Sequence, residues 1–119
     1  MSSITDTIQE VINSGNNHLE LKELPRVLFN ATRIIILNDL AYFGETSYSE
    51  LKTRLKVSDG TLSSHIRQLI DEKIIDPKKG TIENNKAVTR YLFTKSGWDL
   101  FDKFVDILEE LFIWKRKKD

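Results

Sequence analysis

Hydroxyl, amide and guanidinium side chains gather between residues 58 and 68, and they offer the clearest chemistry in the sequence. Apolar residues in this region recur at helical spacing: Leu62, Ile66, Leu69 and Ile70. The spacing predicts a helix from Asp59 to about Glu72 with one apolar stripe. Opposite the stripe lie small or polar residues: Gly60, Ser63, Ser64 and Arg67. Such a face suits contact with nucleic acid, where side-chain donors bind phosphates and base edges.

Each polar residue of this helix has an expected role. We expect Ser58 and Thr61 to donate hydroxyls to phosphates, because backbone N–H groups also point outward at a helix N-terminus. Arg67 has two possible targets, a guanine edge or a phosphate, and Gln68 could read adenine. Asp59 has three interpretations: a helix cap, a base reader that accepts from cytosine, or a source of repulsion.

Small side chains matter here as well. Gly60, Ser63 and Ser64 would let the helix backbone approach the major groove closely, since that groove is about 12 Å wide.

The elements before this helix form a helix-turn-helix pattern. Asn30 is predicted to cap a central helix over Ala31–Phe43, which Gly44 closes. Ser49 is predicted to cap a short helix over Glu50–Lys56. Val57 then forms the turn, and Ser58 caps the longer helix.

A β-hairpin is predicted to follow. Ile74 and Ile75 begin a strand, which Pro77 restricts to a sheet edge or a bulge, and Val88–Thr94 forms the return strand. The segments between them, 78–80 and 83–86, are polar and turn-rich, and the hairpin is expected to have a mobile tip. We expect three basic residues of the hairpin to meet a minor groove or the DNA backbone: Lys78, Lys79 and Lys86.

The formal net charge of zero at first argues against nucleic acid, because DNA-binding domains are usually basic. The charge is unevenly distributed, however. Residues 1–46 sum to −3, residues 47–95 to +4 and residues 96–119 to −1. Electrostatic steering of a ligand depends on the local potential more than on the net charge of the chain. Such a charge run can also be only a solvated surface.

The stretch Ala31–Gly97 resembles the MarR/ArsR-like winged-helix transcriptional regulators, most of all the small single-domain archaeal-type group. The resemblance rests on these motifs: Asn30-Ala-Thr-Arg-Ile34, Tyr48-Ser-Glu-Leu-Lys52, Val57-Ser-Asp-Gly-Thr-Leu-Ser-Ser-His65, Ile66-Arg-Gln-Leu69 and Thr89-Arg-Tyr-Leu-Phe-Thr-Lys-Ser-Gly97. It implies that Ser58–Gln68 is the recognition helix and Pro77–Val88 the wing. The family often has Pro and Arg near the return strand, where this chain has Ala87 and Val88. Lys86 or Arg90 would then take the place of the wing arginine.

Thr94 is predicted to cap a long last helix from Lys95 to about Lys115. Two apolar stripes run along it, and one stripe suffices for packing on its own domain. We therefore expect the second stripe to form a coiled-coil-like homodimer interface with the same helix of a second copy. A predicted helix over residues 4–12 would add to this interface. The expected interface residues are Ile4, Ile8, Leu100, Phe104, Ile107, Leu108, Leu111, Phe112 and Trp114. The alternative is that residues 4–12 of the same chain cover the second stripe.

Several other kinds of chemistry find no support in the sequence. The chain has 119 residues, no Cys and two His, too few for a usual zinc site. His65 is expected to pack or hydrogen-bond between helices. The longest aliphatic run, Ile34–Leu37, is far short of the roughly 20 apolar residues of a membrane span. No enzyme activity, cofactor, metal or membrane partner is expected.

The predicted fold is mainly α with a small β-hairpin wing (α+β), a winged helix-turn-helix with N- and C-terminal dimerisation helices. We expect one domain, divided into residues 1–24, a core over 25–94 and a last helix with tail over 95–119. The expected function is a cytoplasmic, homodimeric, sequence-specific regulator that binds double-stranded DNA and represses by blocking promoter access. The alternatives are a protein-docking winged helix and a non-specific architectural DNA-binding protein. A small-molecule effector is compatible with the sequence, but no sequence feature demands one.

Overall fold

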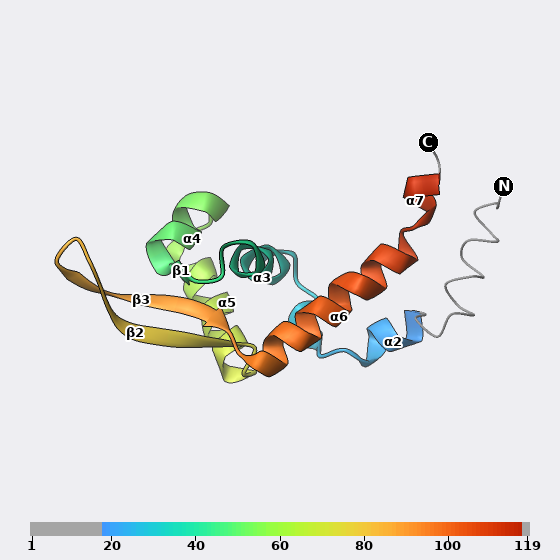
Figure 1. Cartoon of the computed structure of the whole chain (residues 1–119), viewed down its shortest axis with the longest axis horizontal. Helices are drawn as coiled ribbons and strands as arrows, with labels where there is room; N and C mark the ends of the chain where they lie inside the picture. Colours follow the sequence, from blue (N-terminus) through green and yellow to red (C-terminus); the bar gives the residue numbers. More distant parts are fainter. Residues whose placement is uncertain (1–17, 118–119) are drawn as a thin grey trace. The chain divides into compact units, whose positions relative to one another are not determined.

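The computed structural model describes residues 18–117, a mainly helical chain with one small antiparallel sheet (Figure 1). Residues Arg26–Asp99 form one compact unit, and the described residues on either side of it belong to another. None of the helices in residues 18–117 combines the length and apolarity needed to cross a bilayer. The single domain expected over the whole chain stays a prediction, and the predicted helix over residues 4–12 lies outside the described residues.

The centre of the first unit is α3 (Ala31–Phe43), which begins and ends as the sequence predicts. The Asn30 side chain accepts a hydrogen bond from the Arg33 N–H at 3.0 Å. At the other end, Gly44 adopts a φ of 86° and its N–H donates to the Leu40 carbonyl at 2.8 Å. Leu37 and its neighbours Ile36 and Leu40 are almost wholly buried, so α3 is the core around which the other elements pack. Two short elements precede it, α2 (His18–Glu23) and the 3-10 helix η1 (Arg26–Leu28).

The helix-turn-helix consists of α4 (Tyr48–Leu55) and α5 (Asp59–Asp71). Ser58 caps α5 as predicted. The prediction that Ser49 caps α4 is wrong. The cap is Ser47, two residues before Ser49, and it forms a reciprocal capping box with Glu50. The Glu50 N–H donates to Ser47 Oγ at 3.2 Å, and the Ser47 N–H donates to the Glu50 carboxylate at 3.3 Å. A Ser followed three residues later by Glu is the known signature of such a box.

The sheet has three antiparallel strands in the order β1 (Thr46–Ser47), β3 (Lys86–Phe93) and β2 (Ile75–Glu83). Pro77 therefore lies on an edge strand, as predicted. The turn expected within 83–86 is confirmed, whereas the turn-rich segment 78–80 lies inside β2, which runs on to Glu83. Only Asn84 and Asn85 form the turn, with φ values of 50° and 64°. Positive φ at both central residues is what a tight hairpin turn requires, and Asn tolerates it.

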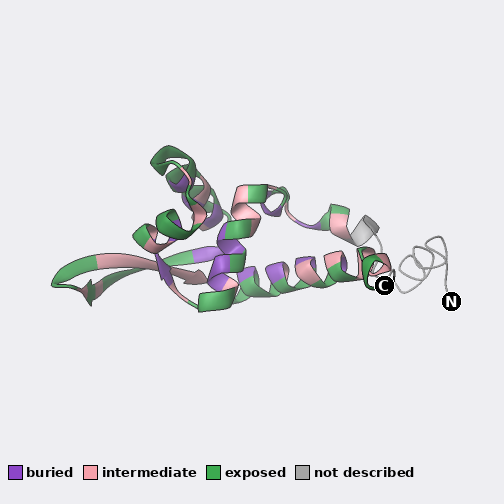
Figure 2. Cartoon of the chain, turned by 90° about the horizontal axis from the view of Figure 1, so that it is seen from above, coloured by how far each residue is buried: buried purple, intermediate pink, exposed green. Residues whose placement is uncertain are grey.

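The hairpin projects beyond the helices of its unit (Figure 1), and its outer part is largely exposed (Figure 2). A shift in pairing between Lys78 and Thr81 accompanies Gly80, whose φ is 85°. The outer half therefore carries few packing contacts and presents mostly polar side chains.

The last helices are α6 (Lys95–Leu111) and α7 (Trp114–Lys117). The predicted continuous helix to about Lys115 is wrong near its end. There the Ile113 N–H donates to the Glu110 carbonyl at 3.3 Å, three residues back rather than four. This tighter bonding ends the regular α-helix at Leu111.

A dense junction fixes the start of α6 against the strand that follows α5. The Thr94 N–H donates to the Ile74 carbonyl at 3.0 Å, and Thr94 Oγ1 accepts from the Gly97 N–H at 2.8 Å. A Cβ atom on Gly97 would lie 1.9 Å from the Ile74 carbonyl oxygen. Only glycine therefore fits at position 97.

We expect Gly97→Ala to destabilise the protein by at least about 1–3 kcal/mol, because the backbone of Ile74 must move to admit the methyl group. Gly60→Ala is the matched control: it also lies in the first turn of a helix, but open space surrounds its Cβ position. That change should be neutral or stabilising by up to about 1 kcal/mol. Urea unfolding measures both, and equal stability of the two variants would contradict the close contact.

Candidate nucleic-acid interface

The recognition face predicted on α5 is solvent-exposed. The apolar residues Leu62, Ile66 and Leu69 are buried. The small and polar residues opposite them are exposed: Gly60, Ser63, Ser64, Arg67 and Gln68. This face is free to enter a groove of DNA.

At the N-terminus of α5, Ser58 and Thr61 pair with each other. Ser58 Oγ donates to Thr61 Oγ1 at 2.9 Å and accepts from the Thr61 N–H at 3.3 Å. The hydroxyl proton of Ser58 is thus committed to the helix cap. The Thr61 hydroxyl retains its own proton and remains able to donate to a phosphate.

Asp59 is neutralised by its neighbours. Lys52 Nζ lies 2.9 Å from one carboxylate oxygen, and the Tyr48 hydroxyl donates to the other at 3.0 Å. The hydrogen bond from Lys52, followed by that from Tyr48, lowers the pKa of Asp59. Ser58 rather than Asp59 caps the helix, and the repulsion expected from Asp59 is offset by the Lys52 charge.

Arg90 is bound within an ion-pair cluster. Its guanidinium lies 2.8 Å from Glu50 and 2.6 Å from Glu83, and it also donates to the Glu45 carbonyl at 3.0 Å. The side chain is only 17% exposed. Contrary to the expectation for a wing arginine, the guanidinium is already occupied, so we leave Arg90 out of the proposed DNA contacts.

Arg54 is likewise occupied. It holds the buried carboxylate of Asp39 through two nitrogens, at 2.6 and 2.9 Å, and its guanidinium lies 4.2 Å from the centre of the Phe43 ring. These contacts join α4 to α3, so the charge of Arg54 is structural.

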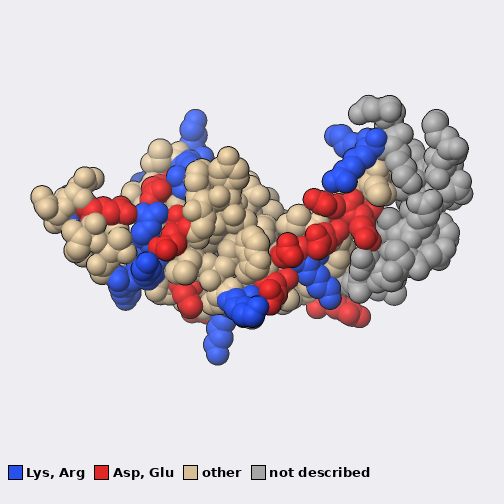
Figure 3. Space-filling view, viewed as in Figure 1, with Lys and Arg blue, Asp and Glu red and all other residues tan. Residues whose placement is uncertain are grey.

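The cations of residues 47–95 thus divide into two groups. Five of them form no ion pair with the residues that the structure describes: Lys56, Arg67, Lys73, Lys79 and Lys86. The others face carboxylates, including Lys78, whose Nζ lies 3.5 Å from Glu45. Figure 3 shows basic and acidic side chains interleaved around the hairpin, and a row of acidic side chains along α6. Three of the free cations lie on elements that were predicted to contact DNA: Arg67 on α5, and Lys79 and Lys86 on the hairpin. Lys56 follows α4, and Lys73 lies between α5 and β2.

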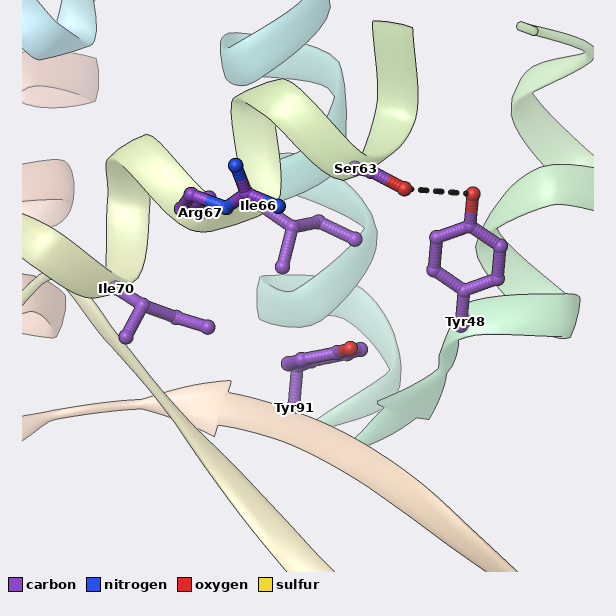
Figure 4. A pocket seen from close by; sticks show the side chains of 6 residues that line it. All are labelled: Tyr48, Ser63, Ile66, Arg67, Ile70 and Tyr91. Carbon is purple, nitrogen blue, oxygen red and sulfur yellow. Dashed lines mark hydrogen bonds between the residues drawn. The ribbon is translucent and has the colours of Figure 1, made fainter. Parts of the chain in front are cut away.

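A pocket that the sequence did not reveal lies between α5, α4 and β3 (Figure 4). Tyr48 and Tyr91 line it together with Ser63 and Arg67. The alternation of β3 places Tyr91 on one face of the strand, but the sequence does not show which helix that face meets. The sequence therefore gives no signal that Tyr91 lines a pocket with α5.

His65 packs between helices, as predicted. Its Nδ1 accepts a hydrogen bond from Arg33 Nε at 3.0 Å, and Arg33 also donates to the Val27 carbonyl at 3.1 Å. Burial, followed by the positive charge of Arg33, lowers the pKa of His65. The imidazole is therefore a neutral structural acceptor.

The predicted dimer residues differ in exposure. Phe104 and Ile107 are already buried within the chain, at 3% and 2%, whereas Phe112 is 52% exposed. The remaining described members are of intermediate exposure: Leu100, Leu108, Leu111 and Trp114. Ile4 and Ile8 lie outside the described residues. Phe112 is therefore the strongest candidate for contact with a partner, and the dimer itself stays a prediction.

A helix-turn-helix followed by an antiparallel hairpin defines a winged helix. The sequence matches the model of the winged helix DNA-binding domain over residues 32–112, more than half of the chain, and the protein belongs to this family. The predicted MarR-like winged-helix fold is thereby confirmed. No curated protein sequence matches the chain significantly.

Solved structures share the fold. A transcriptional regulator homologue from Pyrococcus horikoshii superimposes with a TM-score of 0.69 at 25% identity, over 80% of this chain and 95% of that one. The adhesin competence repressor of Streptococcus pyogenes gives 0.60 at 17% identity, over 99% and 85%. MarR of Staphylococcus aureus, solved with salicylate and kanamycin, gives 0.61 at 18% identity, over 73% and 57%.

The half-buried His65 predicts a pH dependence of stability. Because the folded-state pKa of His65 is below the ordinary 6.5, folding favours the neutral form. Its contribution is complete above pH 6.5 and is lost as the pH falls toward the folded-state pKa. We expect the free energy of unfolding to decline over this range, and His65→Gln, which retains an acceptor for Arg33, to lack that part of the decline.

Urea unfolding at pH 7.5, 6.5 and 5.5 measures the effect. His18→Gln removes the other histidine of the chain and serves as the control, which should keep the decline of the parent protein. An identical pH profile for His65→Gln and the parent would show that His65 does not titrate as proposed.

Proposed function

We propose that the protein is a sequence-specific regulator of transcription that binds double-stranded DNA. The observation that carries this proposal is the exposed polar face of α5 beside a projecting, basic hairpin. Within this family fold, α5 would enter the major groove and the hairpin would contact the adjacent backbone or minor groove. Gln68 and Ser64, one helical turn apart on the exposed face, would read base edges. Lys79 and Lys86 would bind phosphates.

Dimerisation would supply the affinity that one protomer lacks. With few free cations, a single copy releases few counterions from DNA, so its binding should be modest. A two-fold dimer would place two copies of α5 about one DNA turn apart on a pseudo-palindromic site. Bound at a promoter, such a dimer would repress transcription by occlusion, and one structural neighbour is named a repressor.

The test is a titration of the full chain with selected and with random duplexes over a salt series. A regulator of this kind binds the selected duplex more tightly, and the logarithm of its affinity falls linearly with that of the salt concentration. Equal affinity for all sequences would instead support an architectural DNA-binding protein. An absence of binding at low salt would support a protein-docking module.

Gln68→Ala sharpens this test. If Gln68 pairs with adenine, the variant should lose about 1–3 kcal/mol of discrimination at that base pair while its affinity for random duplex stays unchanged. Asn38→Ala, which removes an exposed amide from α3, is the matched control and should alter neither value. Unchanged discrimination in Gln68→Ala would remove that residue from base reading.

The dimer has a separate test. Phe112→Glu places a charge at the exposed aromatic residue of the predicted seam, and sedimentation should show it shifting from dimer to monomer, because an unpaired charge opposes apolar association. Tyr42→Glu, an 81% exposed aromatic on α3, is the control and should leave the dimer intact. A dimeric Phe112→Glu protein would show that the seam lies elsewhere.

A further inference from the structure

The pocket between α5, α4 and β3 has the shape and the donors of an anion site. It has a volume of about 320 Å³ and is open to solvent. Figure 4 shows the Tyr91 ring of β3 beneath the apolar side chains of Ile66 and Ile70, and the Tyr48 hydroxyl meeting Ser63. Six residues line the pocket: Tyr48, Ser63, Ile66, Arg67, Ile70 and Tyr91. Apolar walls with a few polar groups are typical of ligand sites, and the polar groups fix the orientation of what binds. Here those polar groups include one cation, Arg67.

The hydrogen bonds show which donors remain available. Tyr48 has one hydroxyl proton, and the charged carboxylate of Asp59 at 3.0 Å is its strongest acceptor. Ser63 lies 3.1 Å from the Tyr48 oxygen and can donate to it. This chain of hydroxyls therefore points its protons toward Asp59 rather than into the pocket.

Two side chains of the pocket remain without such partners. Neither the Arg67 guanidinium nor the Tyr91 hydroxyl forms a hydrogen bond or ion pair with the described residues. Burial raises the pKa of Tyr91, so its hydroxyl stays protonated at neutral pH and can donate. Arg67 offers several further donors and a full positive charge.

We propose that this pocket holds one phosphodiester of the DNA backbone, with Arg67 and Tyr91 as the donors to its oxygens. The inference rests on the proposed function. A phosphodiester carries a single negative charge, which the single unpaired cation of the pocket matches. Tyr48 and Ser63 are positioning residues, because they hold the wall of the pocket and keep the Asp59 carboxylate engaged. Arg67 thus anchors α5 on the backbone and leaves base reading to neighbouring residues.

Tyr91→Phe is the most selective test. It removes only the hydroxyl and keeps the ring that packs beneath α5, so the fold is retained. We expect roughly a tenfold loss of affinity for duplex DNA, the effect of one hydrogen bond to a charged group, with an unchanged salt slope. Tyr42→Phe, at an exposed tyrosine outside the pocket, is the control and should bind as the parent protein does.

Arg67→Ala tests the second donor. Its affinity should fall alike for selected and random duplexes, and its salt slope should decrease by about 1. A single neutral methylphosphonate linkage, moved stepwise along the duplex, should weaken the parent protein at each phosphate that a side chain binds. One such position per half-site should be the phosphate of this pocket. At that position, the methylphosphonate should lower the DNA affinity of Tyr91→Phe and Arg67→Ala only slightly further, because these variants already lack a contact to that phosphate.

The outcomes separate the inference from the function on which it rests. If the parent protein binds no duplex, both are overturned. If it binds and Tyr91→Phe matches Tyr42→Phe, or if Arg67→Ala relaxes preference at one base pair, only the pocket inference is overturned. A free phosphate could use the same donors, so inorganic phosphate is titrated separately. Binding of inorganic phosphate at the pocket without any effect of Tyr91→Phe on DNA would also overturn the inference.

Discussion

The ion-pair cluster of Arg90 is the interaction on which the arrangement of the wing depends. Arg90 lies on β3, Glu83 on the partner strand and Glu50 on α4, so one guanidinium joins the hairpin to the helix-turn-helix. The pairing of β1 with β3 is short, and Ser47 lies opposite Arg90 in it. Ion pairs on an open surface contribute little, about 0–1 kcal/mol. Here the Arg90 side chain is mostly shielded, whereas Glu50 and Glu83 are 37% and 40% exposed. Without Arg90, the carboxylates gathered around it would repel one another.

The same use of charge explains how a chain of zero net charge can present a basic surface. Lys52 offsets Asp59 at the start of α5, and Arg54 offsets the buried Asp39. These pairs offset charges locally, while the cations of residues 47–95 that form no such pair keep their full charge. The acidic residues of α6 help to bring the net charge of the chain to zero, but they lie on a different element from the unpaired cations. Net charge therefore says little about which surface meets a polyanion.

Local signals predicted much of the fold. The cap at Asn30, the stop at Gly44 and the apolar stripe of α5 depend on neighbours within one or two turns, and all three are confirmed. The errors arose where a second signal was overlooked or where the partner is distant. Ser47 and Glu50 form a cap that a three-residue spacing would have revealed. Pairing of the polar residues near Gly80 depends on the opposite strand, which composition alone does not show.

The candidate site was harder to predict than the fold, because side-chain availability is a tertiary property. Arg90 and Arg67 look equivalent as sequence letters. In the structure, Arg90 meets three glutamates that lie seven to forty-five residues away, whereas Arg67 meets none. Nothing in the sequence marks Tyr91 as a pocket residue, and its place in the pocket is seen only when β3 lies beneath α5.

The junction at Thr94 links the reading helix to the rest of its unit. The Thr94 hydroxyl lies 2.7 Å from the Lys73 carbonyl, just beyond the end of α5, and the same oxygen caps the first turn of α6. Gly97 brings that turn against the backbone of Ile74, where β2 is about to begin. A change in the direction of this first turn must therefore displace the end of α5 or break these hydrogen bonds. The orientation of the recognition helix is thus fixed from both ends, by the Tyr48–Asp59 contact at its start and by Thr94 beyond its end.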